Sequence, residues 1–193
     1  GDISAVSHNP MKIFGGLGEI GSVFTDSDEL AEKIKILRYN GTINKEFLKY
    51  PSLNFRSDSL NAAFLKTRIK YLPEKIKRRR DIANIYNQRL DNICITPRET
   101  INSSRVYYTY SIQVDDRDGL SNYLLNNKIE TKVQHPLLMS QQEPYLECKS
   151  YTPKANEIVK KLLCLPIHEK LSDEEVFYVI DKIHEYKTLS VND

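Results

Sequence analysis

Ser7-His8-Asn9-Pro10-Met11-Lys12, with the glycine-rich stretch Gly15 to Gly21 directly behind it, is the segment from which the rest of this chain is best interpreted. The apolar run Ile3 to Val6 precedes it and predicts a buried strand. A lysine between a strand end and flexible glycines can project into a cleft. We therefore treat Lys12 as a candidate nucleophile, although most lysines are solvated surface cations.

Length and composition are those of an ordinary globular protein. The 193 residues suffice for one domain, or for one domain and part of another. The net charge of +2 is small, and nucleic-acid-binding proteins usually concentrate a larger positive excess on one face, so we expect no nucleic-acid partner. Cys94, Cys148 and Cys164 are widely spaced, which argues against a disulfide framework and indicates a reducing, intracellular setting.

Membrane and metal sites are not indicated either. The chain has no apolar run near the length of a membrane span, and its first residues lack the pattern of a signal peptide, so we expect a cytoplasmic protein. The four histidines have no spacing that would close a metal site, and we expect no metal. They are His8, His135, His168 and His184.

The pattern along the chain predicts a mixture of helices and strands. After the glycines we expect a strand over 20–25, a helix from Asp28 to about Arg38 and an irregular loop over 42–54. A long helical region should begin at Asp58 and continue past Pro73 to about residue 91.

The last hundred residues predict a compact α+β unit. We expect strands over 92–95, 106–114 and 130–133, and helices over 118–127 and 155–163. Ser172 to Glu175 form a capping box that opens a final helix, and the tail past Leu189 should fray.

Two other motifs favour a structural interpretation over a binding site. Gly16 to Gly21 has the spacing G-x-G-x-x-G of a dinucleotide site, but the third glycine opens an expected strand where that site needs a helix. The basic run Lys75 to Arg80 has no interleaved aromatic residues, so it predicts a solvated or domain-bridging helix face.

Taken in order, the motifs resemble the DegT family of nucleotide-sugar aminotransferases, which are fold-type I pyridoxal-phosphate enzymes. The residues that carry the resemblance are Ser7-x-Asn9-Pro10-Met11-Lys12, Glu19 and Gly21, Leu37-Arg38-Tyr39-x-Gly41-Thr42, Ser52-Leu53-Asn54-Phe55-Arg56-x-Asp58 and Leu165-Pro166-Ile167-His168. The resemblance covers nearly the whole chain in register.

The resemblance implies roles for individual residues. Lys12 would bind pyridoxal 5'-phosphate covalently and then act as general acid and base, tasks that suit an amine whose pKa is drawn toward neutrality. Ser7 would hydrogen-bond the cofactor phosphate. Asn54 would reach the phosphate of the neighbouring subunit's cofactor, which implies a homodimer. Arg56 and His135 are weaker candidates for substrate binding.

The resemblance also implies the architecture. The fold class would be α/β, the C-terminal part of a fold-type I aminotransferase: residues 1–57 a remnant of the cofactor-binding large domain, 58–91 an interdomain helix and 92–193 a small α+β domain. His8 stands where the family usually has an aromatic residue, and Gln134-His135-Pro136 departs from the family's histidine-tyrosine-proline segment. Family members are about twice as long, and their other half carries the acid that pairs with the pyridinium nitrogen.

The expected function is therefore transfer of an amino group, with glutamate as the expected donor, to a nucleotide-linked keto-sugar that feeds a polysaccharide or another glycan. This chain alone should be inactive. Two alternatives stay open. A related enzyme of the same fold might use Lys12 for sugar dehydration, or the chain might be a non-catalytic dimerisation or interaction module.

Overall fold

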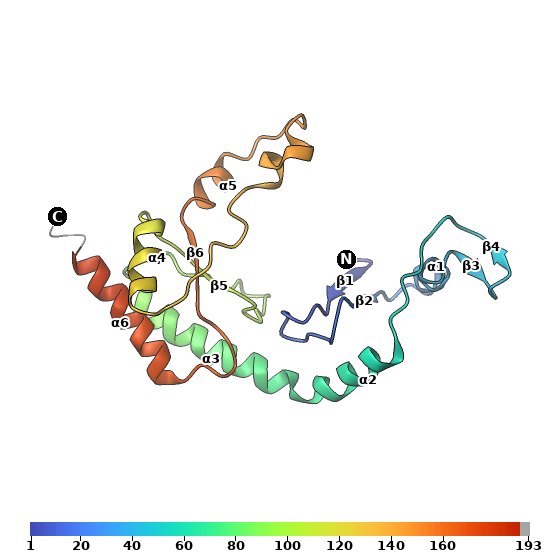
Figure 1. The fold of residues 1–193 in the computed structure, drawn as a ribbon, viewed down its shortest axis with the longest axis horizontal. Coiled ribbons are helices and arrows are strands. Elements are labelled where there is room, and N and C mark those ends of the chain that lie inside the picture. The colour runs from blue at the N-terminus through green and yellow to red at the C-terminus, as the bar shows by residue number, and fades with distance from the viewer. Residues whose placement is uncertain (190–193) are drawn as a thin grey trace. The chain divides into compact units, whose positions relative to one another are not determined.

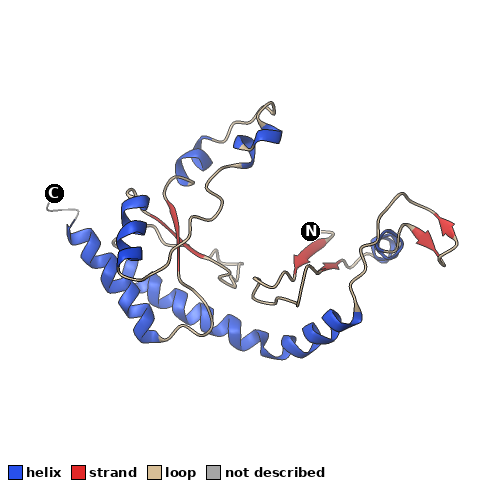
Figure 2. Ribbon diagram, in the orientation of Figure 1, coloured by secondary structure: helices blue, strands red, loops and turns tan. Residues whose placement is uncertain are grey.

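The computed structural model describes residues 1–189, and the chain divides into two compact units (Figures 1 and 2). Unit 1 comprises Gly1–Pro73, and unit 2 begins at Glu74. The expected fraying past Leu189 lies outside the described residues. The three-part division predicted from the sequence, with residues 58–91 as an interdomain helix, stays a prediction.

Unit 1 contains a two-stranded antiparallel sheet. Strands β1 (Ser4–Ser7) and β2 (Gly21–Phe24) pair so that Ser7 lies opposite Gly21. The prediction that the glycine segment leads into a strand is confirmed. The prediction of a buried first strand is wrong for this chain, since all four residues of β1 are exposed. A two-stranded sheet has no second layer of its own to cover its apolar side chains.

The rest of unit 1 is local structure around two helices. Helix α1 (Asp28–Arg38) begins where Ser27 Oγ accepts a hydrogen bond from Leu30 N at 3.3 Å. After its last residue the chain turns through Gly41, which has a positive φ of 70° and whose N–H donates to Ile36 O at 3.0 Å. Strands β3 (Thr42–Ile43) and β4 (Phe47–Leu48) then form a short hairpin within the segment predicted as a loop.

The long helical region is two helices joined by a tight turn. Helix α2 (Ser59–Arg68) is capped by Asp58, the 3-10 turn η1 (Ile69–Tyr71) follows, and helix α3 spans Leu72–Leu90. Pro73 is the second residue of α3. Its missing N–H is harmless there because the first turn of a helix has no intrahelical acceptors for its N–H groups.

Unit 2 is an α+β fold built around one antiparallel strand pair, β5 (Tyr110–Gln113) and β6 (Leu162–Leu165). Along β5, Tyr110 and Ile112 are buried while Ser111 and Gln113 face the other side. Helix α3, helix α4 (Arg117–Asn126) and helix α6 (Asp173–Leu189) supply most of the other core residues. The largest fully buried side chains are Tyr86, Tyr110, Ile82, Leu90, Ile112, Leu124, Leu163, Ile183 and Val176.

Several predicted elements of unit 2 are shorter than expected or absent. Residues 92–95 form a turn that ends in a single bridge between Ile95 and Gln113, and 130–133 contribute only a bridge from Lys132 to Cys164. The strand predicted over 106–114 is confined to β5. Helix α5 is only Pro153–Ile158, and the 3-10 turns η2 (Met139–Gln141) and η3 (Glu143–Tyr145) precede it.

The basic run on α3 was predicted to be a solvated or domain-bridging helix face. The solvated interpretation holds for Lys77, whose side chain is 77% exposed, but it is wrong for Arg79. Arg79 is only 8% exposed. Its guanidinium donates to the carbonyl oxygens of Tyr107 at 3.0 Å and Ile167 at 2.9 Å. It also pairs with Glu169 at 3.2 Å, and Lys75 pairs with the same carboxylate at 2.9 Å. The run therefore fastens α3 to the segment after β6.

The predicted capping box is confirmed. Ser172 N donates to Glu175 Oε2 at 2.8 Å, and Glu175 N donates to Ser172 Oγ at 3.2 Å, at the start of α6. None of the helices over residues 1–189 is long and apolar enough to cross a membrane.

Candidate functional site

The turn that follows β1 positions Lys12. Asn9 organises this turn: its Oδ1 accepts from Met11 N at 2.9 Å, and its carbonyl oxygen accepts from Lys12 N at 2.8 Å. Its Nδ2 donates to Glu19 Oε1 at 2.5 Å. Ser7 Oγ accepts from Asn9 N at 3.3 Å. An asparagine that bonds the backbone two residues ahead stabilises such a turn, so Ser7 and Lys12 belong to one ordered segment.

The buried side chain of His8 stabilises the turn through two hydrogen-bond contacts. It is 3% exposed, and its Nδ1 lies 3.0 Å from Phe14 O while its Nε2 lies 2.8 Å from Ser22 Oγ. Because a carbonyl oxygen can only accept, Nδ1 carries the proton and Nε2 can accept from the serine hydroxyl. The ring also packs edge-on against Phe14, with centroids 4.9 Å apart. His8 is thus a buried, hydrogen-bonded structural ring.

The glycine segment is held by α2. Leu17 N donates to Asn61 Oδ1 at 2.8 Å, and Arg68 donates to Gly15 O at 3.0 Å. A Cβ on Gly16 would lie 2.8 Å from Ile20 Cγ2, so the backbone packs too closely there for a larger residue. Asn61 and Arg68 are contacts that sequence analysis did not single out. Asn61 and Arg68 are seven residues apart, which places them on the same face of α2. This spacing in the sequence could have indicated that the two residues act together.

Asn54 and Arg56 form a second polar group in unit 1. Asn54 Oδ1 accepts from Arg56 Nε at 3.1 Å, and the guanidinium stacks on Tyr39, 4.2 Å from the ring centroid. A bridge between Tyr39 and Asn54 fixes the backbone. Asn54 is exposed, and its Nδ2 donates to none of the residues within 1–189. The hydrogen bonds to Oδ1 therefore orient the Asn54 side-chain amide, and its Nδ2 is available as a hydrogen-bond donor.

His135 belongs to unit 2 and is exposed. Its backbone has a positive φ of 54°, and its Nε2 lies 3.2 Å from Gln134 Nε2. No group of three or more His, Cys, Asp or Glu side chains within residues 1–189 has the arrangement of a metal site.

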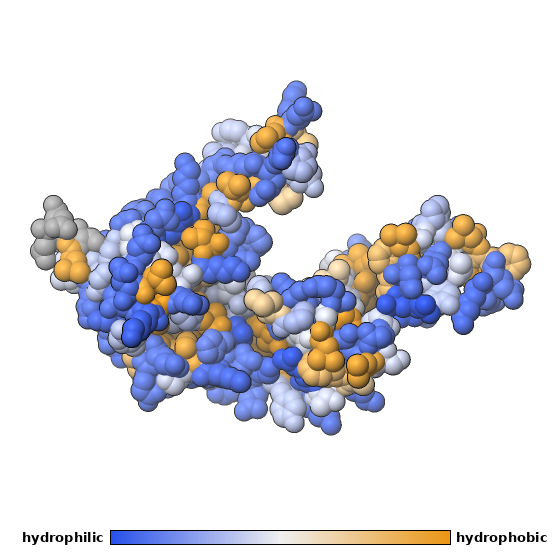
Figure 3. All heavy atoms as spheres, in the orientation of Figure 1, coloured by the Kyte–Doolittle hydropathy of each residue, from blue (hydrophilic) through white to orange (hydrophobic). Residues whose placement is uncertain are grey.

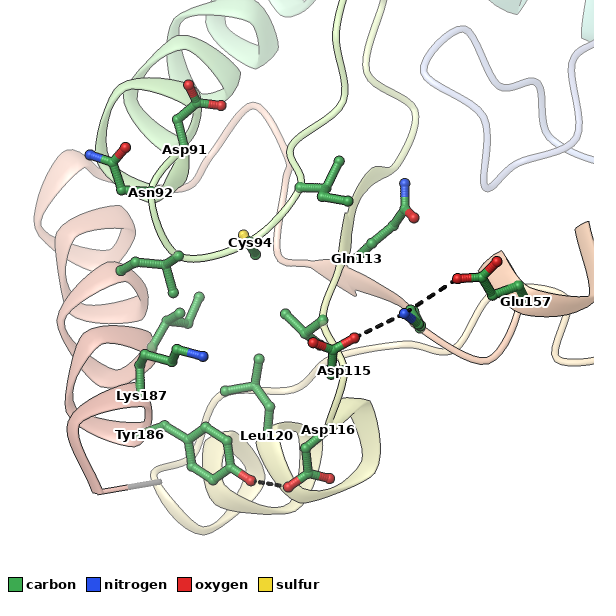
Figure 4. Close-up of a pocket in the computed structure, with 15 residues that line it drawn as sticks. Asp91, Asn92, Cys94, Gln113, Asp115, Asp116, Leu120, Glu157, Tyr186 and Lys187 are labelled. Carbon is green, nitrogen blue, oxygen red and sulfur yellow. Dashed lines mark hydrogen bonds and ion pairs between the residues drawn. The ribbon is translucent and has the colours of Figure 1, made fainter. Parts of the chain in front are cut away.

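A cavity of about 470 Å³ in unit 2 has acidic groups at its rim (Figure 4). These groups are largely engaged: Lys161 pairs with Asp115 at 2.9 Å, and Tyr186 donates to Asp116 at 2.5 Å. Cys94 lines the cavity, but burial and the charge of Asp91 raise the pKa of its thiol to about 12. A thiol that stays protonated is a poor nucleophile, so Cys94 is not a candidate reactive group.

The Lys12 turn fits a cofactor that carries an aldehyde and a phosphate. Lys12 supplies a primary amine for the aldehyde. Ser7 is exposed, and its oxygen accepts from Asn9, which leaves its hydroxyl proton to donate to a phosphate. The glycines behind the turn keep the backbone tight: a Cβ on Gly15 would lie 2.6 Å from Pro10 O.

Comparison with known proteins identifies the family. The family model for the DegT/DnrJ/EryC1/StrS aminotransferase family matches residues 1–184, and the chain belongs to this family. The chain is 31% identical to dTDP-3-amino-3,6-dideoxy-alpha-D-galactopyranose transaminase of Aneurinibacillus thermoaerophilus, covering 86% of the chain and 46% of the relative. It is 30% identical to the "Pleiotropic regulatory protein" of Geobacillus stearothermophilus, covering 96% and 52%. The chain thus spans about half the length of these relatives.

Solved structures support the fold. DesV of S. venezuelae, in complex with a ketimine intermediate, superposes with a TM-score of 0.92 at 27% identity, covering 97% of this chain and 52% of DesV. The structure titled ntda from Bacillus subtilis, with bound cofactor PMP, gives 0.83 at 25% identity, covering 97% and 46%. The predicted fold class is confirmed: this chain is part of a fold-type I α/β aminotransferase fold.

Proposed function

We propose that this chain is the C-terminal half of a pyridoxal-phosphate-dependent enzyme that transfers an amino group from glutamate to a nucleotide-linked keto-sugar. The observation that carries the proposal is the ordered Ser7–Lys12 turn in a chain that matches the family over residues 1–184. Relatives named as sugar transaminases support the substrate class. Because nucleotide sugars are soluble phosphorylated metabolites, we place the enzyme in the cytoplasm.

In this proposal, two residues of the turn hold the cofactor. When bound, pyridoxal phosphate supplies the electron sink and carries the amino group. Lys12 Nζ would hold the cofactor through its aldehyde carbon, and as a free amine it would hold and return the proton that amino transfer requires. Ser7 Oγ donates to the phosphate. Asn9 and the buried His8 keep both side chains on one rigid turn, which favours reproducible positioning.

We also propose that the enzyme is a homodimer in which Asn54 donates from Nδ2 to the phosphate bound by the partner subunit. The available amide donor supports this role. The surrounding segment exposes large apolar side chains, visible as orange spheres around the β3–β4 hairpin (Figure 3). These residues are Phe47, Leu48, Leu53 and Phe55. Exposed apolar groups so close together are typical of a surface that another chain covers.

The 193-residue chain by itself should bind the cofactor weakly and be inactive. The acid that would pair with the pyridinium nitrogen, and the other phosphate ligands, are expected in the remaining half of the protein. Without that acid the ring nitrogen loses its proton and the cofactor loses much of its electron-withdrawing power.

The test is a titration of the full-length parent with pyridoxal phosphate, followed by visible absorbance. We expect a band that Lys12→Ala abolishes and that Lys66→Ala, which removes an exposed lysine of α2, leaves intact. A band that persists in Lys12→Ala would refute the assignment. Amino transfer from glutamate, measured against loss of water from the sugar, separates the aminotransferase from a dehydratase. Absence of both activities together with absence of the band favours the interaction module.

A further inference from the structure

A second cavity lies in unit 2, on the side of the β5–β6 sheet opposite the core. Its volume is about 440 Å³, which lies within the usual range of small-molecule sites, roughly 300 to 1,000 Å³. Its polar lining comes from Ser111 and Gln113 of β5, from Thr109 just before that strand, and from the segment that crosses over from α3. That segment contributes Thr96, Arg98 and Arg105.

Three of the lining groups have unused hydrogen-bonding capacity. The Arg105 guanidinium, the Thr109 hydroxyl and the Gln113 side-chain amide form no hydrogen bond with any residue that the structure describes. The backbone at both positions is nonetheless fixed. Arg105 N donates to Glu99 at 2.9 Å, and Gln113 exchanges backbone hydrogen bonds with Ile95 at 3.1 and 2.9 Å. The backbone is therefore fixed at both positions, while the exposed Arg105 and the half-buried Thr109 and Gln113 keep side-chain donors available to a ligand.

The charge of the cavity is positive. Arg98 and Arg105 are its only charged lining residues among those described. Arg98 is 80% exposed and reaches Asp91 at 3.3 Å through one nitrogen, which leaves the remaining donors of its guanidinium accessible. The Thr96 hydroxyl is not an available donor, because it donates to the same Asp91 oxygen at 3.3 Å. No carboxylate lines the cavity itself.

We propose that this cavity binds a phosphate group, either as the free ion or as part of a phosphate ester. A phosphate presents several acceptor oxygens and a negative charge, which matches two arginines flanked by hydroxyl and amide donors. A carboxylate offers fewer acceptors and would leave part of this donor set unused. The site is built from residues of unit 2 alone, and the inference does not rest on the proposed aminotransferase activity.

The test is isothermal titration of the full-length parent with inorganic phosphate and, separately, with uridine diphosphate, at ionic strength held constant with sodium chloride. Arg105→Gln should weaken binding by roughly tenfold or more, the loss of one charge-assisted hydrogen bond. Arg98→Gln should weaken phosphate binding less than Arg105→Gln does, because the Arg98 guanidinium already forms an ion pair with Asp91. Arg38→Gln, which removes an exposed arginine of α1, is the matched control and should have no effect.

Each outcome decides the proposal. The proposal is supported if binding is saturable and is weakened by Arg105→Gln but not by Arg38→Gln. The ligand that binds more tightly then shows whether the site recognises the free phosphate ion or a phosphate ester. Binding that is not saturable, or that all three variants weaken equally, overturns it as general charge attraction. If Arg105→Gln alters the circular dichroism spectrum, Arg105→Lys replaces it. That variant keeps the charge and loses the planar fork, and unchanged affinity in it would overturn recognition by the guanidinium.

Discussion

Replacement of Glu169 by glutamine should destabilise unit 2 in a pH-dependent way. The Glu169 carboxylate forms ion pairs with the ammonium group of Lys75 at 2.9 Å and with the guanidinium of the buried Arg79 at 3.2 Å. Burial raises the pKa of Glu169, but the hydrogen bond from Lys75 and the charges of Lys75 and Arg79 outweigh it and lower this pKa from 4.5 to about 2. A shift of this size corresponds to about 3 kcal/mol in the absence of solvent screening. Because the side chain is 26% exposed, we expect a loss of about 1 to 2 kcal/mol.

The sign of the pH dependence follows from the lowered pKa. The folded protein holds Glu169 ionised at a pH where the unfolded chain would protonate it. The stabilisation is therefore fully present above about pH 4.5 and is lost as the pH falls toward 2. Wild type and Glu169→Gln should differ most near neutral pH and converge in acid.

Urea unfolding followed by near-UV circular dichroism measures this difference, since the buried tyrosines Tyr86, Tyr107 and Tyr110 all belong to unit 2. Glu147→Gln, at an exposed position, is the matched control and should unfold like wild type at every pH. Equal stability of Glu169→Gln and Glu147→Gln at pH 7 would refute the stabilising role of these ion pairs. So would a loss of stability in Glu169→Gln that stays constant between pH 7 and 3.

Three further substitutions test the packing and the local structure. Leu124→Ala removes a fully buried side chain and should cost about 2 to 5 kcal/mol in urea unfolding, whereas Leu125→Ala, on the exposed side of α4, should cost little. Ser172→Ala breaks the capping box of α6 and should cost about 1 kcal/mol by the same assay. Gly41→Ala places a Cβ against Tyr50 O at a positive φ, so amide hydrogen exchange over 41–50 should accelerate strongly. Unchanged exchange would contradict the observed turn.

Local signals in the sequence were the most successful predictors. The capping box at Ser172 and the helix stop at Asn40-Gly41 depend on contacts within a few residues, and each is present. The predictions of strands over 92–95 and 130–133 were wrong. A strand requires a pairing partner elsewhere in the chain, and each of these segments forms only one bridge, with Gln113 and with Cys164 respectively.

The basic run on α3 shows the same limit for charge. Its composition is compatible with a solvated face, and only the packing of residues 107 and 167–169 against the helix reveals that Arg79 is buried and hydrogen-bonded. Lys75, Arg78 and Arg79 lie three and four residues apart, on one helix face. That spacing was the signal that pointed to a shared role.

The sequence by itself determined the family and the order of its motifs, because the spacing from Ser7 to Lys12 and on to Asn54 is a property of the chain and needs no coordinates. Only the tertiary structure decided how those residues are held. His8 is buried between Phe14 O and Ser22 Oγ, the glycine segment is fixed by Asn61 and Arg68, and the donors of Arg105 and Gln113 converge on one cavity. These contacts join residues far apart in the chain, and such pairings follow from packing rather than from local sequence.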